Sequence, residues 1–353
     1  MSKLVPALLE WFATNARKMP WRETHDPYAV WVSEIMLQQT QVKTVIPYWE
    51  RWMRDLPDVA ALAAAPAAKV LKLWEGLGYY SRARNLHAAA QLIVEKFGGH
   101  FPRAFSDILE LPGVGRYTAG AIASIAYNDP APILDGNVMR VLTRVFGIDG
   151  DPRGKATNQQ LWALAAQLVE HAANQPHSAK TRACSHLNQS LMELGALVCT
   201  PRQPACPACP VRQLCVAQRD QRTQELPALA PRGATTARRF VAFVITRGNR
   251  HLVQQRPSGV VNAGLWEFPN LELKAAATPP AERVALPTGR IVRATTSLGS
   301  LTHSITRYRI TVEVFRAELL EDSPQPDEHW VSATELEELA FTSAHRKIVA
   351  RLG

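Results

Sequence analysis

The chain has no hydrophobic run long enough to cross a membrane, because no apolar stretch of its 353 residues approaches the roughly 18–20 residues that a transmembrane helix needs. The first eleven residues also lack the basic-then-apolar pattern of a secretory signal, since Pro6 and Glu10 interrupt them. These absences argue against membrane and secreted proteins. We therefore expect a soluble, cytoplasmic protein. We also expect it to be a monomer.

Acidic residues are in short supply relative to basic ones. The chain has 40 Lys and Arg against 31 Asp and Glu, which gives a net charge of +9. Such an excess favours a polyanionic partner such as nucleic acid. No long Lys/Arg run marks a binding tail, however, so the charge indicates a class of partner without identifying it.

Cysteine is scarce and unevenly distributed. Four of the five cysteines lie between positions 199 and 215, and Cys184 stands apart. A disulfide framework would spread its cysteines along the chain, so this crowding indicates a metal site in a reducing compartment. We expect Cys184 to be a buried thiol.

The four clustered cysteines are separated by six, two and five residues: Cys199, Cys206, Cys209 and Cys215. Structural zinc sites usually use two short Cys-x2–4-Cys units, and here only Cys206 and Cys209 form one. A 4Fe–4S cluster tolerates wider, looped spacing, and the prolines of the loop stiffen it. We predict that these cysteines bind a 4Fe–4S cluster; zinc and four free thiols are the alternatives.

The sequence changes character after residue 220, and its length fits about two domains of roughly 150 residues each. Residues 1–220 carry amphipathic runs at helical spacing, which predicts an all-α domain. Residues 221–237 have the composition of a linker. Residues 238–353 alternate as strands do and end in helical runs, which predicts an α+β domain. Helices are expected over 30–46, 60–74, 86–97, 116–127, 138–146, 159–171, 186–198, 333–339 and 343–351, and strands over 240–246, 252–254 and 308–315.

Residues 108–119 have the form of a helix, a tight turn and a second helix around the sequence Leu-Pro-Gly-Val-Gly. Gly113 and Gly115 permit the turn and a close approach of the backbone. The second helix is expected to begin near Arg116, so that its free N–H groups suit a phosphate. A simple corner between two helices is the alternative.

Eighteen residues after Tyr117 stands Asp135, which taken alone is expected to cap the following helix. The order of the Leu-Pro-Gly-Val-Gly turn, this aspartate and the Cys-x6-Cys-x2-Cys-x5-Cys loop resembles the helix-hairpin-helix DNA glycosylase superfamily over residues 1–220. The resemblance implies that Gly113 and Gly115 lie in a hairpin that holds DNA phosphates. It also implies that Asp135 stabilises the cationic sugar formed as a base leaves, which is electrostatic catalysis.

Glu34 lies among apolar neighbours in the segment 31–41, Trp-Val-Ser-Glu-Ile-Met-Leu-Gln-Gln-Thr-Gln. Such surroundings should raise the pKa of a carboxyl group, which suits a general acid; a surface glutamate is the alternative. The segment resembles the MutY-type adenine DNA glycosylases closely. The resemblance implies that Glu34 protonates adenine, which leaves poorly as an anion.

Position 117 distinguishes two branches of the superfamily. Endonuclease III-like members that also cut the strand carry a lysine here, whose amine attacks the sugar and forms a Schiff base. Tyr117 cannot form that imine, which predicts a monofunctional enzyme. The same matching places Tyr117 and Asn137 beside Asp135 in the catalytic group.

Further segments resemble MutY elements that surround the extruded nucleotide. Gln38 and Gln39 correspond to a pair that wedges into the base stack, and Tyr79, in Gly-Leu-Gly-Tyr, to a second wedge beside the opposite base. Extrusion costs on the order of a few kcal/mol, and a wedge holds the gap open. For Trp21 and Tyr79, core packing is the alternative. The resemblance implies substrate contacts for Trp21, Arg22, Gln38, Gln39, Thr40, Tyr79 and Gln189.

Residues 238–353 resemble the Nudix-like domain of the MutY family through Leu-Trp-Glu-Phe-Pro at 265–269. In that family the domain recognises 8-oxoguanine opposite adenine. No acidic Arg-Glu-x-x-Glu-Glu helix follows, so no pyrophosphatase activity is expected. Where the family commonly has His-x-Phe-Ser-His, this chain has His-Ser-Ile-Thr-Arg: Thr306 keeps a hydroxyl group for recognition, and Arg307 is a candidate phosphate contact.

These features predict a monofunctional adenine DNA glycosylase of base excision repair, with an all-α helix-hairpin-helix domain and a Nudix-like second domain. Its predicted partner is double-stranded DNA with adenine opposite 8-oxoguanine or guanine. An endonuclease III-like pyrimidine glycosylase with lyase activity is opposed by Tyr117 and by the second domain. A non-enzymatic iron–sulfur DNA-binding or redox-sensing protein is opposed by the pair of carboxylates Glu34 and Asp135.

Overall fold

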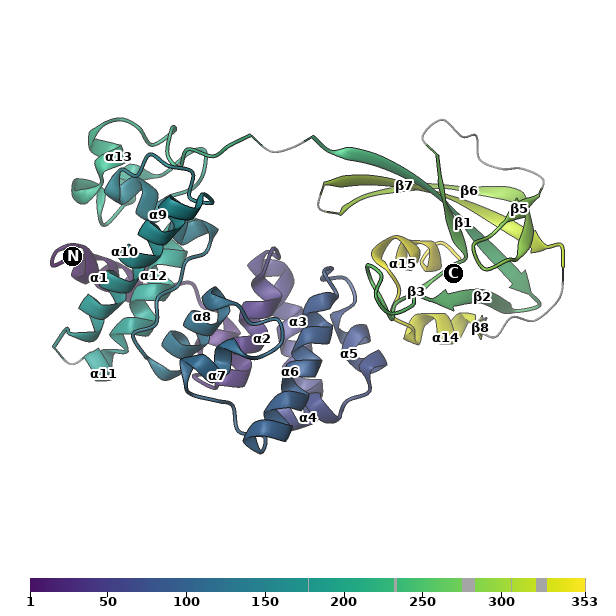
Figure 1. The fold of residues 1–353 in the computed structure, drawn as a ribbon, viewed down its shortest axis with the longest axis horizontal. Helices are drawn as coiled ribbons and strands as arrows, with labels where there is room; N and C mark the ends of the chain where they lie inside the picture. The colour runs from purple at the N-terminus through teal and green to yellow at the C-terminus, as the bar shows by residue number, and fades with distance from the viewer. Residues whose placement is uncertain (177, 232–233, 275–282, 306, 322–328, 353) are drawn as a thin grey trace. The chain divides into compact units, whose positions relative to one another are not determined.

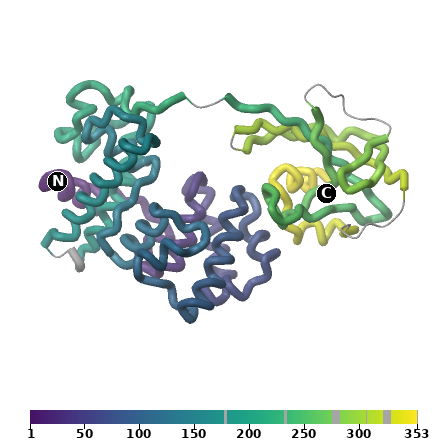
Figure 2. Tube along the Cα trace, in the orientation of Figure 1, coloured from purple at the N-terminus to yellow at the C-terminus, as the bar shows by residue number. Residues whose placement is uncertain are grey.

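The computed structural model describes residues 1–176, 178–231, 234–274, 283–305, 307–321 and 329–352 (Figures 1 and 2). By its internal contacts the chain divides into two compact units. The first comprises Met1–Ala64 and Asn85–Pro231, and the second comprises Ala65–Arg84 and Arg232–Gly353. Within the described ranges, no helix is long and apolar enough to span a membrane. The domain limits 1–220, 221–237 and 238–353 stay a prediction.

The first unit is helical, as the sequence predicts. Helix α12 (Ala183–Leu197) lies at its centre and contacts α1, α8, α9 and α10. Cys184, in the first turn of this helix, is buried in the apolar core, as expected. The other elements are α1 (Leu4–Asn15), η1 (Pro20–Arg22), α2 (Pro27–Leu37), α3 (Val42–Asp55), α4 (Val59–Ala64), α6 (Ser81–Phe97, which begins in the second unit), α7 (Phe105–Leu109), α8 (Arg116–Tyr127), α9 (Gly136–Phe146), α10 (Lys155–Ala173), α11 (Ser178–Thr181), η2 (Cys206–Ala208), η3 (Arg212–Leu214) and α13 (Val216–Arg219).

The continuous helix predicted over 30–46 is wrong. Helix α2 ends at Leu37 and α3 begins at Val42, because Gln39 adopts a left-handed backbone with φ of 58° that no helix continues through. Apolar residues continue at helical spacing on both sides of this break, so periodicity alone does not reveal it. The run predicted over 60–74 is likewise divided, at Pro66.

The glycine turn joins α7 and α8 as predicted. Gly113 has φ of 77°, and a Cβ added there would lie 2.6 Å from Cβ of Asn85, so a larger residue is excluded on both counts. Gly115 occupies the N-cap position of α8, with open space where its Cβ would be. The N-terminus of α8 is therefore bordered by a small residue that lets another molecule approach closely.

The second unit is built on a mixed sheet whose strand order is β3-β2-β1-β7-β6-β5, with β4 paired to β1 and β8 to β2. Strands β1 and β7 are parallel, whereas the other pairs are antiparallel. The elements are α5 (Ala67–Trp74), β1 (Thr236–Arg247), β2 (Arg250–Gln255), β3 (Trp266–Glu267), β4 (Asn270–Leu273), β5 (Val284–Ala285), β6 (Ile291–Ile305), β7 (Tyr308–Leu319), β8 (His329–Ser332), α14 (Ala333–Glu338) and α15 (Ser343–Val349).

Both faces of the sheet are covered with apolar side chains. Along β1, Ala242 and Val244 belong to one core, whereas Val241 and Phe243 belong to the other, as the alternation of a strand requires. The first of these cores includes Ile348 of α15. Strand β6 was not expected from the sequence, because much of it is exposed and it has no clear apolar alternation.

The contact of α8 with the segment before α9 leaves no room at Gly120, where an added Cβ would lie 2.2 Å from the carbonyl oxygen of Pro132. We expect Gly120→Ala to lower the free energy of unfolding by about 1–3 kcal/mol, because the backbone must move to admit the methyl group. Gly136→Ala is the matched control, since nothing lies within 4 Å of its added Cβ. Urea unfolding measures both; equal stabilities would contradict the packing argument.

Candidate active site

A cavity of about 900 Å³ opens in the first unit between the α2–α3 loop and helices α2, α8, α9 and α12. Its volume falls in the range of ligand pockets. The structure brings ten of the predicted site residues to its walls from segments far apart in the chain. They are Trp21, Arg22, Glu34, Gln38, Gln39, Thr40, Tyr117, Asp135, Asn137 and Gln189.

Glu34 lies on α2 and is 5% exposed. Burial raises the pKa of its carboxyl group to about 7, and the negative charge of Asp135 acts in the same direction. The hydroxyl group of Tyr117 donates a hydrogen bond of 2.8 Å to Oε2 of Glu34, which opposes the rise in pKa. A carboxyl group in this state holds or releases a proton close to neutral pH.

Asp135 is the N-cap of α9 and also faces the cavity. Its Oδ1 accepts from the backbone N–H of Val138 at 2.7 Å, and its Oδ2 accepts from Nδ2 of Asn137 at 3.0 Å. Burial raises the pKa of Asp135, while these hydrogen bonds oppose the rise. The helix N-terminus favours an anion at this place. The capping role and a role in the site are therefore compatible, and Asp135 is better suited than Glu34 to remain ionised.

Gln38, Gln39 and Thr40 reach the cavity because α2 ends just before them. Nε2 of Gln38 lies 3.4 Å from Oγ1 of Thr118, and the left-handed backbone of Gln39 turns the chain. Trp21 is buried edge-to-face against Trp49, with ring centroids 6.0 Å apart. Trp21 thus both packs in the core and lines the cavity.

An ion-pair group at the wall of the cavity, centred on the buried Glu193, was missed in the sequence. The side chain of Glu193 is 1% exposed and accepts hydrogen bonds from Nε of Arg17 at 2.7 Å and Nη2 of Arg22 at 3.1 Å. Although burial opposes ionisation, these contacts lower the pKa of Glu193 to about 2. Gln189 also lies on α12, four residues earlier, and donates to Oγ of Ser185 at 3.1 Å. This spacing, which places both side chains on one helix face, was the available signal.

Three of the residues predicted to contact DNA do not line this cavity. Gly113 and Gly115 form the turn before α8 and are not among the residues that line the cavity. Tyr79 belongs to the second unit, where its side chain is 41% exposed and its backbone is left-handed with φ of 46°. Thr306 lies outside the described residues.

The four clustered cysteines line one small cavity between α9, α12 and the 199–215 loop. Nη1 of Arg144 lies 3.4 Å from Sγ of Cys199, and burial raises the pKa of the Cys209 thiol to about 11. Within the described residues no group of His, Cys, Asp or Glu side chains is arranged to hold a metal ion. A single zinc ion needs its sulfurs at about 2.3 Å, whereas the four thiolates of an iron–sulfur cube each bind a different iron and stand further apart. Four cysteines around one cavity fit the second requirement better than the first.

Arg140 connects this loop to the larger cavity, and it too was missed in the sequence. Its Nε donates to the carbonyl oxygen of Cys199 at 2.7 Å, and its Nη2 donates to Oδ1 of Asn137 at 2.9 Å. Because Asn137 in turn donates to Asp135, hydrogen bonds run from the first cysteine of the loop to the aspartate. The spacing of Asn137 and Arg140, three residues apart on α9, was the sequence signal.

The ion pairs of Glu193 predict an acid-sensitive stability. Because the pKa of Glu193 in the folded protein lies below the ordinary glutamate value of 4.5, its stabilising contribution is full above that pH and is lost as the pH falls toward 2. We expect Glu193→Gln to lower the free energy of unfolding by roughly 3 kcal/mol at neutral pH and to flatten its decline in acid.

Urea unfolding at a series of pH values measures this effect. Glu318→Gln is the matched control, because Glu318 pairs with Arg293 on the surface, with 58% of its side chain exposed. A Glu193→Gln variant whose stability falls with acid as steeply as that of the control would contradict the assignment.

Comparison with known proteins agrees with the fold and with the sequence motifs. Residues 32–167 match the HhH-GPD superfamily of base excision DNA repair proteins, and residues 241–351 match the NUDIX domain. The adenine DNA glycosylases of Homo sapiens and Rattus norvegicus align with 97% of this chain, at sequence identities of 35% and 36%. The alignments cover 72% and 76% of the two relatives' own lengths. The structure of a thermostable thymine-DNA glycosylase aligns with this chain at a TM-score of 0.54 and 30% sequence identity. The alignment covers 62% of this chain and 95% of the thymine-DNA glycosylase chain. These matches confirm the predicted fold class, and the chain belongs to the adenine DNA glycosylase family.

Proposed function

We propose that this protein is a monofunctional glycosylase that removes adenine paired with 8-oxoguanine or guanine in double-stranded DNA. The observation that carries the proposal is that two carboxyl groups, the buried Glu34 and the partly buried Asp135, line one cavity while the pKa of Glu34 lies near 7. The names of the relatives support adenine as the base. A non-enzymatic iron–sulfur protein that binds DNA or senses redox state would need no such pair.

In the proposed reaction the carboxyl group of Glu34 donates its proton to a ring nitrogen of the extruded adenine. The bond between the sugar C1′ and the base then breaks, and its electron pair leaves with the neutral adenine. The carboxylate of Asp135 stabilises the oxocarbenium ion left on the sugar. The Glu34 carboxylate next takes a proton from a water molecule whose oxygen attacks C1′, which yields an abasic site and restores the acid.

The other cavity residues orient the base and tune the acid. The Tyr117 hydroxyl keeps the pKa of Glu34 from rising further, and Asn137 fixes the orientation of the Asp135 carboxylate. Outside the acid–base group, we propose that Trp21, Arg22 and Gln189 contact adenine and that Thr40 contacts the substrate. Gln38, Gln39 and Tyr79 wedge into the base stack, and Gly113 and Gly115 contact DNA phosphates.

We further propose that Cys199, Cys206, Cys209 and Cys215 hold a 4Fe–4S cluster. Bound there, the cluster cross-links the 199–215 loop, and base removal needs no redox step from it. The residues of the chain that act between this loop and the cavity are Arg140 and Asn137, which hold Asp135 through hydrogen bonds.

The Nudix-like second domain is proposed to read the base opposite adenine, with Thr306 as a hydrogen-bonding group. Arg307 replaces a histidine of the family pattern, and its Nη2 donates to the Tyr308 hydroxyl at 3.0 Å. An exposed guanidinium group beside this loop suits a DNA phosphate. We propose that the enzyme acts on DNA as a monomer.

The acid role of Glu34 is tested by Glu34→Gln. We expect the variant to lose about 10²–10⁴-fold in the single-turnover rate of adenine release, because an amide cannot donate the proton. Binding to the mismatch should persist. The measurement uses duplexes with 8-oxoguanine, guanine or cytosine opposite adenine, and release should be faster opposite the first two. Loss of binding together with release would instead make Glu34 a structural residue.

The pH profile gives a second readout with a defined sign. Release by the unsubstituted enzyme should decline as the pH rises through about 7, where Glu34 loses its proton. Tyr117→Phe removes the hydrogen bond that lowers the pKa of Glu34, so the decline should move to higher pH. If the pH profile of Tyr117→Phe coincides with that of the unsubstituted enzyme, Glu34 is not the titrating group.

Monofunctional action is tested by borohydride trapping on a duplex with an abasic site. Tyr117 offers no amine, and among the described residues that line the cavity Lys43, on α3, is the only lysine. We expect little covalent adduct compared with an endonuclease III-like enzyme. A strong adduct that disappears in Lys43→Gln would show that Lys43 attacks the sugar, and it would overturn the monofunctional proposal.

A further inference from the structure

Residues 65–84 belong to the same compact unit as the sheet of the second domain, and they carry the loop of Gly76 to Tyr79. Gly76, Gly78 and Tyr79 have φ values of 105°, 70° and 46°. A left-handed backbone is unfavourable for tyrosine and persists only where the surroundings determine it. Contacts from elsewhere in the second unit must therefore hold this loop in place.

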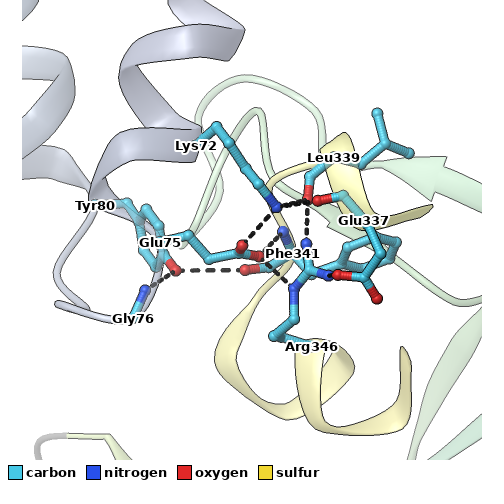
Figure 3. A network of polar contacts seen from close by, with 8 residues as sticks. All are labelled: Lys72, Glu75, Gly76, Tyr80, Glu337, Leu339, Phe341 and Arg346. Carbon is cyan, nitrogen blue, oxygen red and sulfur yellow. Dashed lines mark hydrogen bonds and ion pairs between the residues drawn. The ribbon is translucent and has the colours of Figure 1, made fainter. Parts of the chain in front are cut away.

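The backbone of one residue in the second domain binds both ends of the loop (Figure 3). The N–H of Phe341 donates to Oε1 of Glu75 at 2.7 Å, directly before Gly76, and the hydroxyl of Tyr80, directly after Tyr79, donates to the carbonyl oxygen of Phe341 at 3.3 Å. The Tyr80 hydroxyl also accepts from the N–H of Gly76 at 3.3 Å. The loop is thus closed on itself and attached at one point.

Charged groups reinforce this attachment (Figure 3). Nε of Arg346, on α15, donates to Oε1 of Glu75 at 2.8 Å, and Nζ of Lys72 donates to Oε2 at 2.8 Å. Lys72 also donates to the carbonyl oxygens of Glu337 and Leu339. The side chain of Glu75 is 13% exposed, so this is not an ordinary surface ion pair. We call this group the latch: Lys72, Glu75, Gly76, Tyr80, Glu337, Leu339, Phe341 and Arg346.

Inside the loop, hydrogen bonds carry the constraint from the latch to Tyr79. Nη2 of Arg82 donates to the carbonyl oxygens of Leu77 and Gly78 at 3.0 and 3.1 Å, and Nε1 of Trp74 donates to Gly78 at 3.0 Å. The guanidinium group of Arg82 lies 5.7 Å from the centre of the Tyr79 ring. The ring remains 41% exposed and available to a partner.

We infer that the second domain positions Tyr79 through the latch, with Glu75 and Arg346 as positioning residues for insertion beside the opposite base. This inference rests on the proposed function, in which Tyr79 is that wedge. The domain that reads the opposite base then also holds the side chain that opens the stack there. Loosening the latch should weaken recognition of the mismatch while the acid–base cavity of the first unit stays intact.

The test is Glu75→Gln in the full-length protein. The variant keeps the shape of the side chain but removes its charge from Arg346 and Lys72. We expect its dissociation constant to rise roughly 3- to 30-fold for a duplex with a non-cleavable 2′-fluoro-adenosine opposite 8-oxoguanine. Arg293→Gln, which breaks the exposed pair with Glu318, is the matched control and should bind as the parent does. Unchanged binding by Glu75→Gln would overturn the inference.

A double-mutant cycle with Tyr79→Ala distinguishes positioning from general destabilisation. If Glu75 acts through Tyr79, adding Glu75→Gln to Tyr79→Ala causes no further loss of binding. Independent, additive losses would overturn the inference. Arg346→Gln repeats the cycle from the other side of the ion pair and replaces Glu75→Gln if that variant does not fold.

Failure of the inference and failure of the proposed function give different results. If Tyr79→Ala alone binds the mismatch as tightly as the parent protein, Tyr79 is not a wedge, and both proposals for it are overturned. If Tyr79→Ala weakens binding and Glu75→Gln does not, or if their losses add, the wedge stands and the latch is overturned.

Discussion

The free-energy cost of ionising a buried carboxyl group governs the site in the first unit. Glu34 sits on α2 with almost no access to solvent, and the hydroxyl of Tyr117 only partly offsets the lost hydration. Asp135 is partly buried nearby but receives hydrogen bonds from Val138 and Asn137 at a helix N-terminus. Two groups of similar chemistry are thereby given different surroundings, of which those of Asp135 favour the anion more, as the proposed acid and the proposed anion require.

The surrounding helices are arranged so that this difference is maintained. Glu193 holds Arg17 and Arg22 at the wall of the cavity, where the charge of Arg22 lowers the pKa of Glu34 without offsetting the effect of burial. Arg140 holds Asn137, and through it Asp135, against the backbone of the cysteine loop. The geometry of the cavity thus depends on polar contacts within its wall and on Arg140 behind it. The 4Fe–4S cluster proposed for the four cysteines of that loop would also keep one anchor of these contacts in place.

In the second unit, polar contacts between distant segments likewise hold the loop of Gly76 to Tyr79. The segment of residues 65–84 lies among the helices of the first unit in the sequence, yet it belongs to the second unit, where Phe341 and Arg346 bind Glu75 and Phe341 binds Tyr80. Reading of the opposite base and opening of the stack would then share one rigid support. Such sharing costs little, because the N–H and the carbonyl oxygen of Phe341 are backbone groups that need partners in any fold.

The sequence by itself determined the helical first domain, the glycine turn, the Nudix-like second domain and ten of the residues that line the cavity, because motifs of fixed spacing and apolar periodicity are local properties. It did not reveal the break at Gln39, since periodicity continues on both sides, or strand β6, which lacks alternation. Only the tertiary structure decided the pKa of Glu34 and its contact with Tyr117, and only it identified Glu193, Arg140 and the latch of Glu75 with Arg346. Burial and ion pairing between residues far apart in the chain depend on where the fold brings them, and a linear pattern carries no information about that distance.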